Sequence, residues 1–427
     1  MRDLFVTAVI FASLPFILYR PYIGVLVWTW LAYMNPHKLA WGFATEMPFA
    51  LIIAVTTLFA FFISREPKKI PWTRETIVLV LFTVWMFITT WLSLYPELAW
   101  PQWDKVWKIQ LMTLITLMLM SSKARLNLLI WVIVLSLGFY GVKGGIWVLS
   151  TGGAHRVLGP MRSFIGGNNE IGLALIMTVP LMRYLQLNVS IPWIRYALTA
   201  AIVLTCIAVL GTHSRGALVG IVAMALFLLL KSRRRLVPLL IVGLMIAIAP
   251  RIMPEKWFDR METIETYRED KSAMERLRAW GNAYDLASKR LLGGGYNVLI
   301  VYGERDAHSI YFEVMGEHGF IGFSLYILLG FFTWRSCTWI IRKTKKDPTN
   351  KWAADLAAMI QVSLVGFGAA GAFLGLAYFD LSYLLVAIVV LAKLMVKKSL
   401  AEAEDQQAVD LHAVGPNPIY PYHTPGS

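Results

Sequence analysis

Apolar runs recur along most of this chain, and no other feature limits its possible folds as strongly. The runs are about 14 to 24 residues long, and a helix that crosses a bilayer needs about 20 apolar residues. Because the lipid core offers the backbone no hydrogen bonds, such runs must cross it as α-helices. The alternating strands that build membrane barrels are absent from the sequence. The sequence therefore predicts an all-α polytopic membrane protein with about 12 transmembrane helices.

The composition agrees with this fold class. Of 427 residues, 57% are hydrophobic and 15% are charged, whereas about 25% of the residues of a soluble domain are charged. The formal net charge is +14, but the excess Lys and Arg residues are scattered among short loops between the apolar runs. That distribution is typical of membrane orientation and not of nucleic-acid binding.

Basic clusters in the loops predict the orientation, because short loops rich in Lys and Arg stay in the cytoplasm. Five clusters fall on one side if the crossings alternate: Arg65 with Lys68 and Lys69, Lys123 with Arg125, residues 231–235, residues 342–346, and Lys397 with Lys398. The outer stretches are then 35–47, 150–170 and 251–319. One count stays open, because the short segments 4–19 and 23–34 together cross either once or twice.

The topology divides the chain into four parts. Residues 1–250 hold the amino-terminal transmembrane helices, including one at 236–249, with short outer loops. Residues 251–319 form one large outer loop that bears the candidate catalytic motifs, and residues 320–398 hold the carboxy-terminal transmembrane helices. Residues 399–427 have the composition of a disordered cytoplasmic tail, because acidic residues lead into a Pro-rich end.

The large outer loop is highly charged yet balanced, with ten basic and ten acidic residues from Arg251 to His308. Within it, residues 274–287 have helical spacing that places Arg276, Trp280 and Tyr284 on one face. Arg278 lies beside that face. We expect helices that pack on the membrane surface and cap a cavity, although a solvated, salt-bridged face would give the same spacing.

A second candidate begins at His308, where the polar loop passes into an apolar helix. If the helix includes the histidine, then His308, Tyr311, Phe312 and Met315 share one face. The histidine would then lie at the membrane surface on a rigid element. A helix-capping segment with an interfacial His and Tyr is the alternative.

Arginines near the outer ends of other predicted helices complete the candidate site. Arg215 follows Thr212-His213-Ser214 at the outer end of an apolar helix, where an ionisable group is costly and is a functional candidate by default. Snorkelling to lipid phosphates is the alternative for Arg215. The loop from Arg156 to Arg162, followed by Asn168 and Asn169, has the composition to bind an anion or a sugar, or to form an ordinary turn. Because outer loops are usually poor in Arg, we expect an anionic ligand, and a diphosphate matches the arginine fork.

These residues resemble the O-antigen ligase and O-antigen polymerase superfamily of bacterial envelope glycosyltransferases. The resemblance rests on Ser214-Arg215-Gly216, Arg276 with Trp280, the glycine run 293–295, and His308-Ser-Ile-Tyr311 followed by Glu317 and Gly319. Ser309 departs from the family, in which Asn often follows the histidine. The segments Tyr19-Arg-Pro-Tyr-Ile-Gly24 and Leu31-Ala-Tyr-Met-Asn-Pro-His37 look like the branch of probable O-glycosylation ligases associated with exosortase systems.

The resemblance implies a fold of the GT-C type in the bacterial inner membrane, with the active site facing the periplasm and no cofactor or metal. The implied partners are an undecaprenyl-diphosphate-linked glycan as donor, a sugar hydroxyl of lipid A core as acceptor, and membrane lipid. The family's essential arginines correspond to Arg215 and Arg276, and its catalytic histidine corresponds to His308. Contacts with the donor diphosphate or glycan are expected from Arg156, Arg162, Arg278, Asn169, Trp280 and Tyr311.

The chemistry of the residues fits such a transfer. A diphosphate is a good leaving group, so Arg215 and Arg276 need only neutralise its developing charge. The acceptor hydroxyl needs a base, which His308 can supply, and attack opposite the diphosphate inverts the anomeric centre. An O-antigen polymerase or a protein O-oligosaccharyltransferase would use the same donor. A lipid-linked glycan transporter is the rival from another class, but it would place charges near the bilayer midplane.

Overall fold

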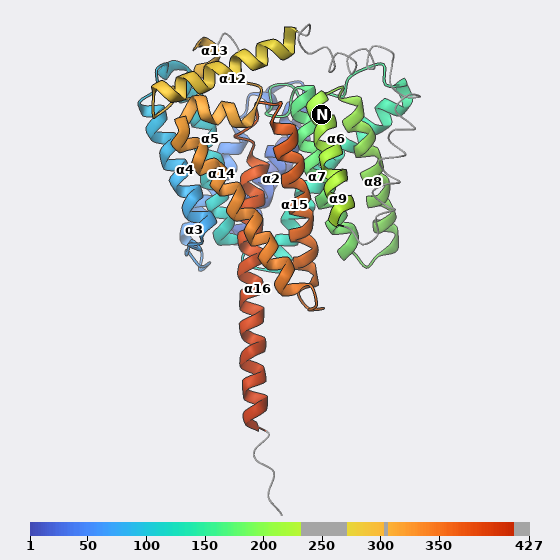
Figure 1. Ribbon diagram of the computed structural model, residues 1–427. Coiled ribbons are helices and arrows are strands. Elements are labelled where there is room, and N and C mark those ends of the chain that lie inside the picture. The colour runs from blue at the N-terminus through green and yellow to red at the C-terminus, as the bar shows by residue number, and fades with distance from the viewer. Residues whose placement is uncertain (232–270, 303–305, 414–427) are drawn as a thin grey trace, which may run out of the picture.

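The computed structural model describes residues 1–231, 271–302 and 306–413, and every regular element in these ranges is a helix (Figure 1). The helices are α1 (Arg2–Tyr19), α2 (Tyr22–Met34), η1 (Pro36–Leu39), η2 (Phe43–Thr45), α3 (Phe49–Ile63), α4 (Arg74–Trp91), α5 (Pro96–Leu119), α6 (Lys123–Thr151), α7 (Asn168–Asn188), α8 (Pro192–Gly211), α9 (Arg215–Lys231), α12 (Lys271–Lys289), α13 (Val298–Tyr302), α14 (Ile310–Thr344), α15 (Lys351–Gly371) and α16 (Asp380–Ala413).

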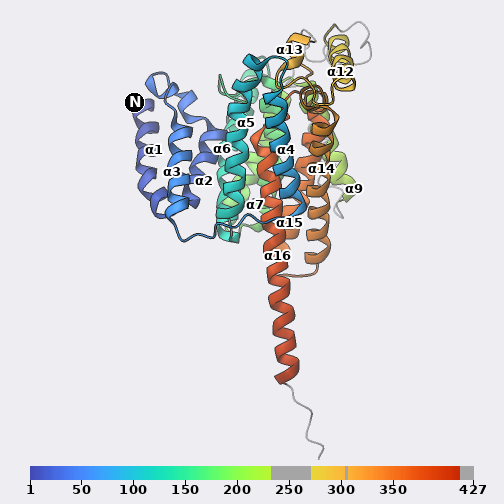
Figure 2. The ribbon, with the colours of Figure 1, turned by 90° about the vertical axis from the view of Figure 1, so that its left-hand side faces the viewer.

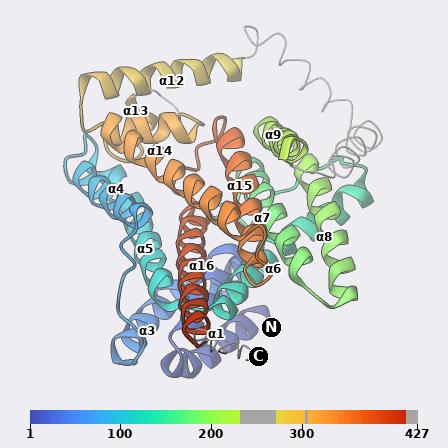
Figure 3. The same ribbon diagram turned by 60° about the horizontal axis from the view of Figure 1, so that its bottom comes forward.

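Most helices run side by side as a bundle, whereas α12 lies across one end of it (Figure 1). We call this end the α12 end, and the opposite end, from which α16 protrudes, the α16 end. Within the bundle α16 is surrounded by other helices (Figure 3). Its residues Leu385, Ala387, Ile388, Val389 and Val390 are completely buried. A helix that is apolar on all sides suits such a central position.

Seven of the described helices are long and apolar enough to cross a membrane, namely α1, α4, α6, α7, α8, α14 and α15. The helices α2 and α3 are apolar but shorter. The chain is therefore a multi-pass, all-α membrane protein, as predicted. The total of about 12 crossings and the GT-C type stay predictions, and the predicted crossing at 236–249 lies outside the described residues.

The first two helices form a hairpin. The turn at Pro21 separates α1 from α2, and the two helices lie beside α3 (Figure 2). One Asp3 carboxylate oxygen accepts the backbone N–H groups of Gly42, at 3.0 Å, and Ala44, at 3.1 Å. Because residues 42–44 follow α2, the start of α1 and the end of α2 lie together. The two helices are thus antiparallel, and the amino terminus lies at the α12 end. Of the two, α1 is long and apolar enough to cross a membrane, whereas α2 is shorter.

The basic loop clusters gather at the α16 end. The Arg125 guanidinium makes a bidentate ion pair with Glu66, at 2.7 and 3.0 Å, which joins the loop after α3 to the start of α6. The Lys123 ammonium lies 5.2 Å from the ring centroid of Trp352, near the start of α15. The predicted grouping of the clusters on one side is confirmed for these loops. Most of the cluster at 231–235 lies outside the described residues.

Two helices differ from the expected pattern. Gly319 has a φ of 65° and kinks α14 near its amino-terminal end.

The expected disorder from residue 399 is wrong for residues 399–413, which continue α16 as a helix. The segment from Ala401 to Gln407 consists of Ala, Glu, Gln and Asp, mostly strong helix formers. It extends a helix that is already nucleated inside the bundle, so elongation costs little.

Candidate active site

The helix α12 covers the bundle end with a face of small and apolar residues. The predicted helix 274–287 lies within it, so this prediction is confirmed. Ala279, Ala283 and Leu286 are buried. Ala283 and Leu286 pack in one cluster with Val298, Leu299 and Ala307. Small side chains let α12 approach the bundle closely, so its neighbouring polar residues are held at the α12 end of the bundle.

Trp280 fixes α12 above the segment that contains the candidate histidine. Its indole N–H donates to the Ala307 carbonyl at 2.9 Å, and its ring stacks on Phe312 with centroids 5.0 Å apart. The ring also lies 6.3 Å from Phe373, just beyond the end of α15. Arg276 precedes Trp280 by one turn on the same helix face and is half-buried. It therefore lies one turn along α12 from the contact between Trp280 and Ala307.

The turn before α9 also packs against Phe373. Ser214 caps α9, its hydroxyl accepting the N–H of Ala217 at 3.2 Å. A Cβ added at Gly216 would lie 3.4 Å from the Ala370 carbonyl oxygen and from Phe373 Cβ. These distances are ordinary van der Waals contacts, so the start of α9 packs directly against the end of α15. The half-buried Arg215 thus begins a helix that packs beside Phe373, as Trp280 does from α12.

His308 lies outside the helix that was expected to carry it. The helix begins at Ile310, Ser309 is extended, and His308 has a φ of 44°. The expected shared helical face of His308, Tyr311, Phe312 and Met315 is therefore wrong for the histidine, because the chain turns at His308 before the helix starts. His308 Nδ1 lies 3.7 Å from Asp306 Oδ2, and the imidazole is 42% exposed. The ring is thus accessible and has a carboxylate beside it.

Asp306 also lines a cavity of about 700 Å³ at the α12 end. Its basic lining residues are Lys38, Lys105, Lys108 and Arg162, and its acidic ones are Asp306, Glu313, Glu317 and Asp380. Burial lowers the pKa of His37, another lining residue, to about 4, so that imidazole is neutral near neutral pH. No group of three His, Cys, Asp or Glu side chains in the described ranges is placed to hold a metal ion. The basic and carboxyl side chains that line the cavity can bind anionic and hydroxyl groups.

Family comparisons divide the chain at the start of α8. Residues 200–327, which contain Arg215, Arg276 and His308, match the family described as O-antigen ligase. The chain carries an O-antigen ligase domain. Residues 1–190 match a family of unknown function (DUF5935). A search of curated proteins found no match. The resemblance to the O-antigen ligase superfamily is thus confirmed, whereas the exosortase-associated branch stays a prediction.

His318, another histidine of the O-antigen ligase domain, has a structural role. His318 is completely buried, and its Nδ1 lies 2.6 Å from the Thr89 hydroxyl. Phe82 and Tyr296 pack edge-on against its ring. Because substrate cannot reach a buried imidazole, His308 is the accessible histidine of the segment 308–319.

The glycine run at 293–295 packs against the first turns of α14. Gly294 N–H donates to the Gly316 carbonyl at 2.9 Å, and Gly295 N–H donates to the Glu317 carbonyl at 2.8 Å. The Glu317 carboxylate accepts the Asn297 N–H at 2.6 Å and the Tyr378 hydroxyl at 2.5 Å. Glu317, which also lines the 700 Å³ cavity, therefore joins α14 to the segment at Asn297 and to Tyr378, which lies between α15 and α16.

The kink at Gly319 predicts a large stability difference between two glycines of α14. A Cβ at Gly319 would lie 2.1 Å from the Leu291 carbonyl oxygen, and its φ of 65° disfavours any side chain, whereas a Cβ at Gly330 meets no atom within 4 Å. We expect Gly319→Ala to lower the free energy of unfolding by about 1 to 3 kcal/mol. Gly330→Ala should be neutral or slightly stabilising. Thermal unfolding of the two purified variants checks the difference, and equal melting temperatures would contradict it.

The remaining predicted site residues lie in different places. Arg278 and Arg156 are exposed, and Arg278 does not share the face of Arg276. Arg162 lies on the 700 Å³ cavity and pairs with Glu46 at 3.6 Å. Asn169 is in the first turn of α7, where Asn168 donates to the Thr212 carbonyl at 3.0 Å beside the Arg215 turn.

Tyr311 faces α15 and not the polar cavity, because its hydroxyl donates to the Gly368 carbonyl at 2.9 Å. It lines an apolar cavity of about 390 Å³ between α14, α15 and α16. Among the charged residues of the larger cavity, the sequence interpretation missed the lysines and the carboxylates of Asp306, Glu313 and Asp380. Lys105 and Lys108 share a helix face by their spacing, and that pattern next to an outer loop is the signal that could have identified them.

Proposed function

We propose that the protein is a glycosyltransferase of the inner membrane that transfers a glycan from undecaprenyl diphosphate to a sugar hydroxyl of lipid A core. The convergence of three distant segments at the α12 end supports this proposal. The Arg215 turn and α12 both pack on Phe373, and Trp280 of α12 binds the backbone beside His308. The α12 end then faces the periplasm, because the basic loops at the other end stay in the cytoplasm.

Each residue has a distinct role in the proposed transfer. Arg215 and Arg276 bind the diphosphate and stabilise the charge that it gains. The acceptor oxygen forms a bond to the anomeric carbon while the bond to the diphosphate oxygen breaks, and the electron pair leaves with the diphosphate. His308 takes the acceptor proton, and the Asp306 carboxylate, 3.7 Å away, stabilises the resulting imidazolium. The reaction inverts the anomeric centre and uses no metal ion.

The 700 Å³ cavity is the proposed site of the sugars. Carboxylates such as Glu313 accept hydrogen bonds from sugar hydroxyls, and Arg162 and Lys105 on the basic side can bind anionic substituents. Asp306 lines this cavity and also lies beside His308. An acceptor sugar in the cavity would therefore lie next to the proposed base.

The apolar 390 Å³ cavity is the proposed site of the polyprenyl chain. It begins at Ile310 and Tyr311, directly after His308, and extends between the membrane helices to Trp334. A donor with its diphosphate at the membrane boundary needs an apolar path of this kind beside the reacting group. The neighbourhood of this cavity and His308 therefore favours a lipid-linked donor over a soluble nucleotide sugar.

Filling the apolar cavity should weaken the use of the lipid-linked donor. Gly330 lines it, and an added side chain there meets no neighbouring atom close to the backbone. We expect Gly330→Leu to fold normally and to raise KM for a long-chain donor by about tenfold, because a filled site loses part of the apolar contact. A donor with a very short lipid should be affected little. Equal KM changes for both donors would contradict the assignment of the cavity.

Reconstitution tests the function itself. The purified protein would be placed in vesicles with an undecaprenyl-diphosphate glycan and lipid A core, in the presence of a chelator. We expect glycosylated core and free undecaprenyl diphosphate in equal amounts. Glycan elongation without core modification would identify a polymerase. Movement of intact donor between leaflets without transfer would identify a transporter and refute the proposal.

A further inference from the structure

A second polar pocket lies toward the α16 end, among the amino-terminal end of α4, α14 and α16. Its volume is about 450 Å³, within the range of about 300 to 1,000 Å³ that ligand sites occupy. Its lining includes four basic side chains and one acidic side chain, together with two tryptophans: Arg74, Arg335, Lys393, Lys397, Glu75, Trp72 and Trp339. We propose that this pocket binds the headgroup phosphate of an anionic phospholipid from the leaflet at the α16 end.

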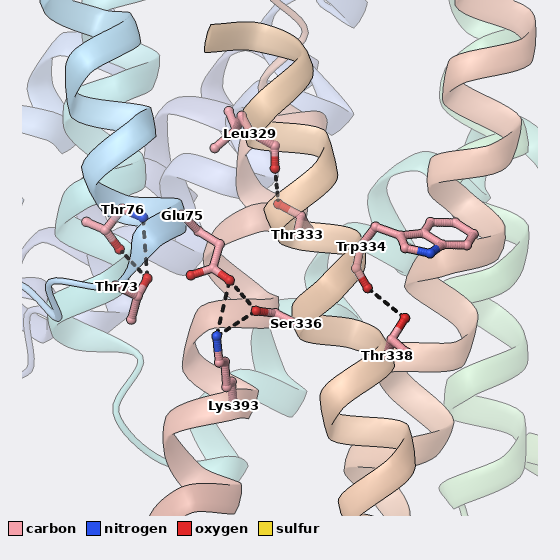
Figure 4. Close-up of polar contacts among 9 residues, drawn as sticks. All are labelled: Thr73, Glu75, Thr76, Leu329, Thr333, Trp334, Ser336, Thr338 and Lys393. Atoms are coloured by element: carbon pink, nitrogen blue, oxygen red, sulfur yellow. Dashed lines mark hydrogen bonds and ion pairs between the residues drawn. The ribbon is translucent and has the colours of Figure 1, made fainter. Parts of the chain in front are cut away.

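The acidic residue of the pocket is already neutralised (Figure 4). Lys393 Nζ lies 3.3 Å from Glu75 Oε1 and 2.7 Å from the Ser336 hydroxyl, which itself donates to Glu75. Glu75 and Ser336 are buried, and a buried carboxylate is stable only when paired in this way. The charges of Glu75 and Lys393 therefore cancel, and the other three basic side chains give the pocket its net positive charge.

Those three side chains, of Arg74, Arg335 and Lys397, are available to a ligand. Each is exposed. Within the described ranges, the ion pair between Lys393 and Glu75 is the only one among the lining residues. Lys393 and Lys397 are one helical turn apart and so share a face of α16. The pocket thus presents a surplus positive charge that a phosphate would match.

The position of the pocket along the axis of α14 places it at the level of the lipid headgroups. Trp339 lies about twenty residues after the kink at Gly319, or about 30 Å along a helix. That length equals the thickness of a bilayer's hydrocarbon core, about 30 Å. If Gly319 lies at one boundary, Trp339 lies at the other, where tryptophans are enriched. Basic pockets between membrane helices at this level bind anionic headgroups.

Apolar surface beside the pocket favours a lipid over a soluble anion. One to two turns toward the bilayer centre, α14 exposes Leu328, together with Ile327 and Phe331, which also line the 390 Å³ cavity. The Arg335 guanidinium lies 5.8 Å from the Phe331 ring centroid, so charged and apolar surfaces adjoin. Acyl chains can lie along these residues while the phosphate enters the pocket. Inorganic phosphate would use only the basic part.

Lipid binding by the detergent-purified full-length protein tests the proposal, with native mass spectrometry as the readout. The probes are phosphatidylglycerol and phosphatidylcholine with identical acyl chains. We expect the wild type to retain phosphatidylglycerol about tenfold or more in preference to phosphatidylcholine, since each basic residue near the headgroup contributes measurably. The double variant Arg335→Gln, Lys397→Gln should lose most of that preference. An excess of glycerol 3-phosphate should not displace the bound lipid.

A matched control separates the pocket from general surface charge. Lys345 and Lys346 are exposed in the turn after α14 and outside the pocket, so Lys345→Gln, Lys346→Gln changes the net charge equally. This control should keep the lipid preference. Equal losses in both double variants, or equal retention of the two lipids by the wild type, would overturn the proposal. Displacement by glycerol 3-phosphate would overturn the lipid assignment. The wild-type comparison requires no variant, so poor folding of a variant cannot leave the proposal untested.

Discussion

Replacing Arg276 by lysine is expected to reduce glycan transfer by about 10²-fold or more, since loss of one oriented donor to a developing charge commonly costs that much. An ammonium keeps the charge but cannot form the two parallel hydrogen bonds of a guanidinium to a diphosphate. Arg215→Lys should have the same effect. The measurement is the initial rate of transfer by purified protein at saturating acceptor, together with the affinity for the donor.

Arg278 supplies the matched control for this prediction. It lies two residues from Arg276 on α12 and is exposed. Arg278→Lys should therefore retain nearly full activity, although the sequence interpretation placed this residue with the donor-binding arginines. Full activity of Arg276→Lys and Arg215→Lys would reduce both residues to a general electrostatic role.

Replacing His308 by alanine is expected to lower the transfer rate by about 10²- to 10⁴-fold, the usual effect of removing a general base. Donor binding should survive, because the proposed diphosphate ligands are Arg215 and Arg276. Folding should also survive, because His308 is 42% exposed and precedes the first turn of α14. Donor affinity, melting temperature and turnover would be measured on one preparation.

His155→Ala is the control for the histidine. His155 is exposed in the loop after α6 and packs near Trp147, with ring centroids 6.1 Å apart. This variant should transfer glycan at the wild-type rate. A structural role for His308 predicts the opposite pattern, with a lower melting temperature and unchanged activity per folded molecule. Near wild-type turnover by a well-folded His308→Ala protein would refute the base assignment.

The membrane fold was predictable because its signals are local. An apolar run of sufficient length has no stable conformation in lipid other than a helix. The helix α12 was predictable for a similar reason, since the spacing of Arg276 and Trp280 requires only 3.6 residues per turn. That spacing also grouped the two residues correctly on one face, and the structure adds the hydrogen bond from Trp280 to Ala307.

The start of α14 was not predictable from periodicity. The apolar pattern after His308 continues backward through the histidine, whereas the backbone leaves the helical region at Ser309 and His308. Backbone reversal of this kind depends on tertiary contacts, here the hydrogen bond from Trp280 to the preceding residue, Ala307. A pattern within one segment carries no information about such a contact.

The 700 Å³ cavity was missed for a related reason. Its charged residues come from segments that are far apart in sequence, such as Lys38 after α2, Lys105 on α5, Glu313 on α14 and Asp380 on α16. Each of these residues alone resembles an ordinary charge near a helix end. Their common site appears only when the helices pack.

The anomeric configuration of the product tests the proposed direct displacement most directly. The purified protein would transfer a glycan from an α-linked lipid diphosphate, and NMR coupling constants would identify the new linkage. Attack by the acceptor oxygen, with His308 as base and the diphosphate held by Arg215 and Arg276, predicts a β-linkage. An α-linkage would contradict direct displacement. Retention would require a covalent glycosyl intermediate, and therefore a nucleophilic residue, and none of these three residues has that role in the proposed reaction.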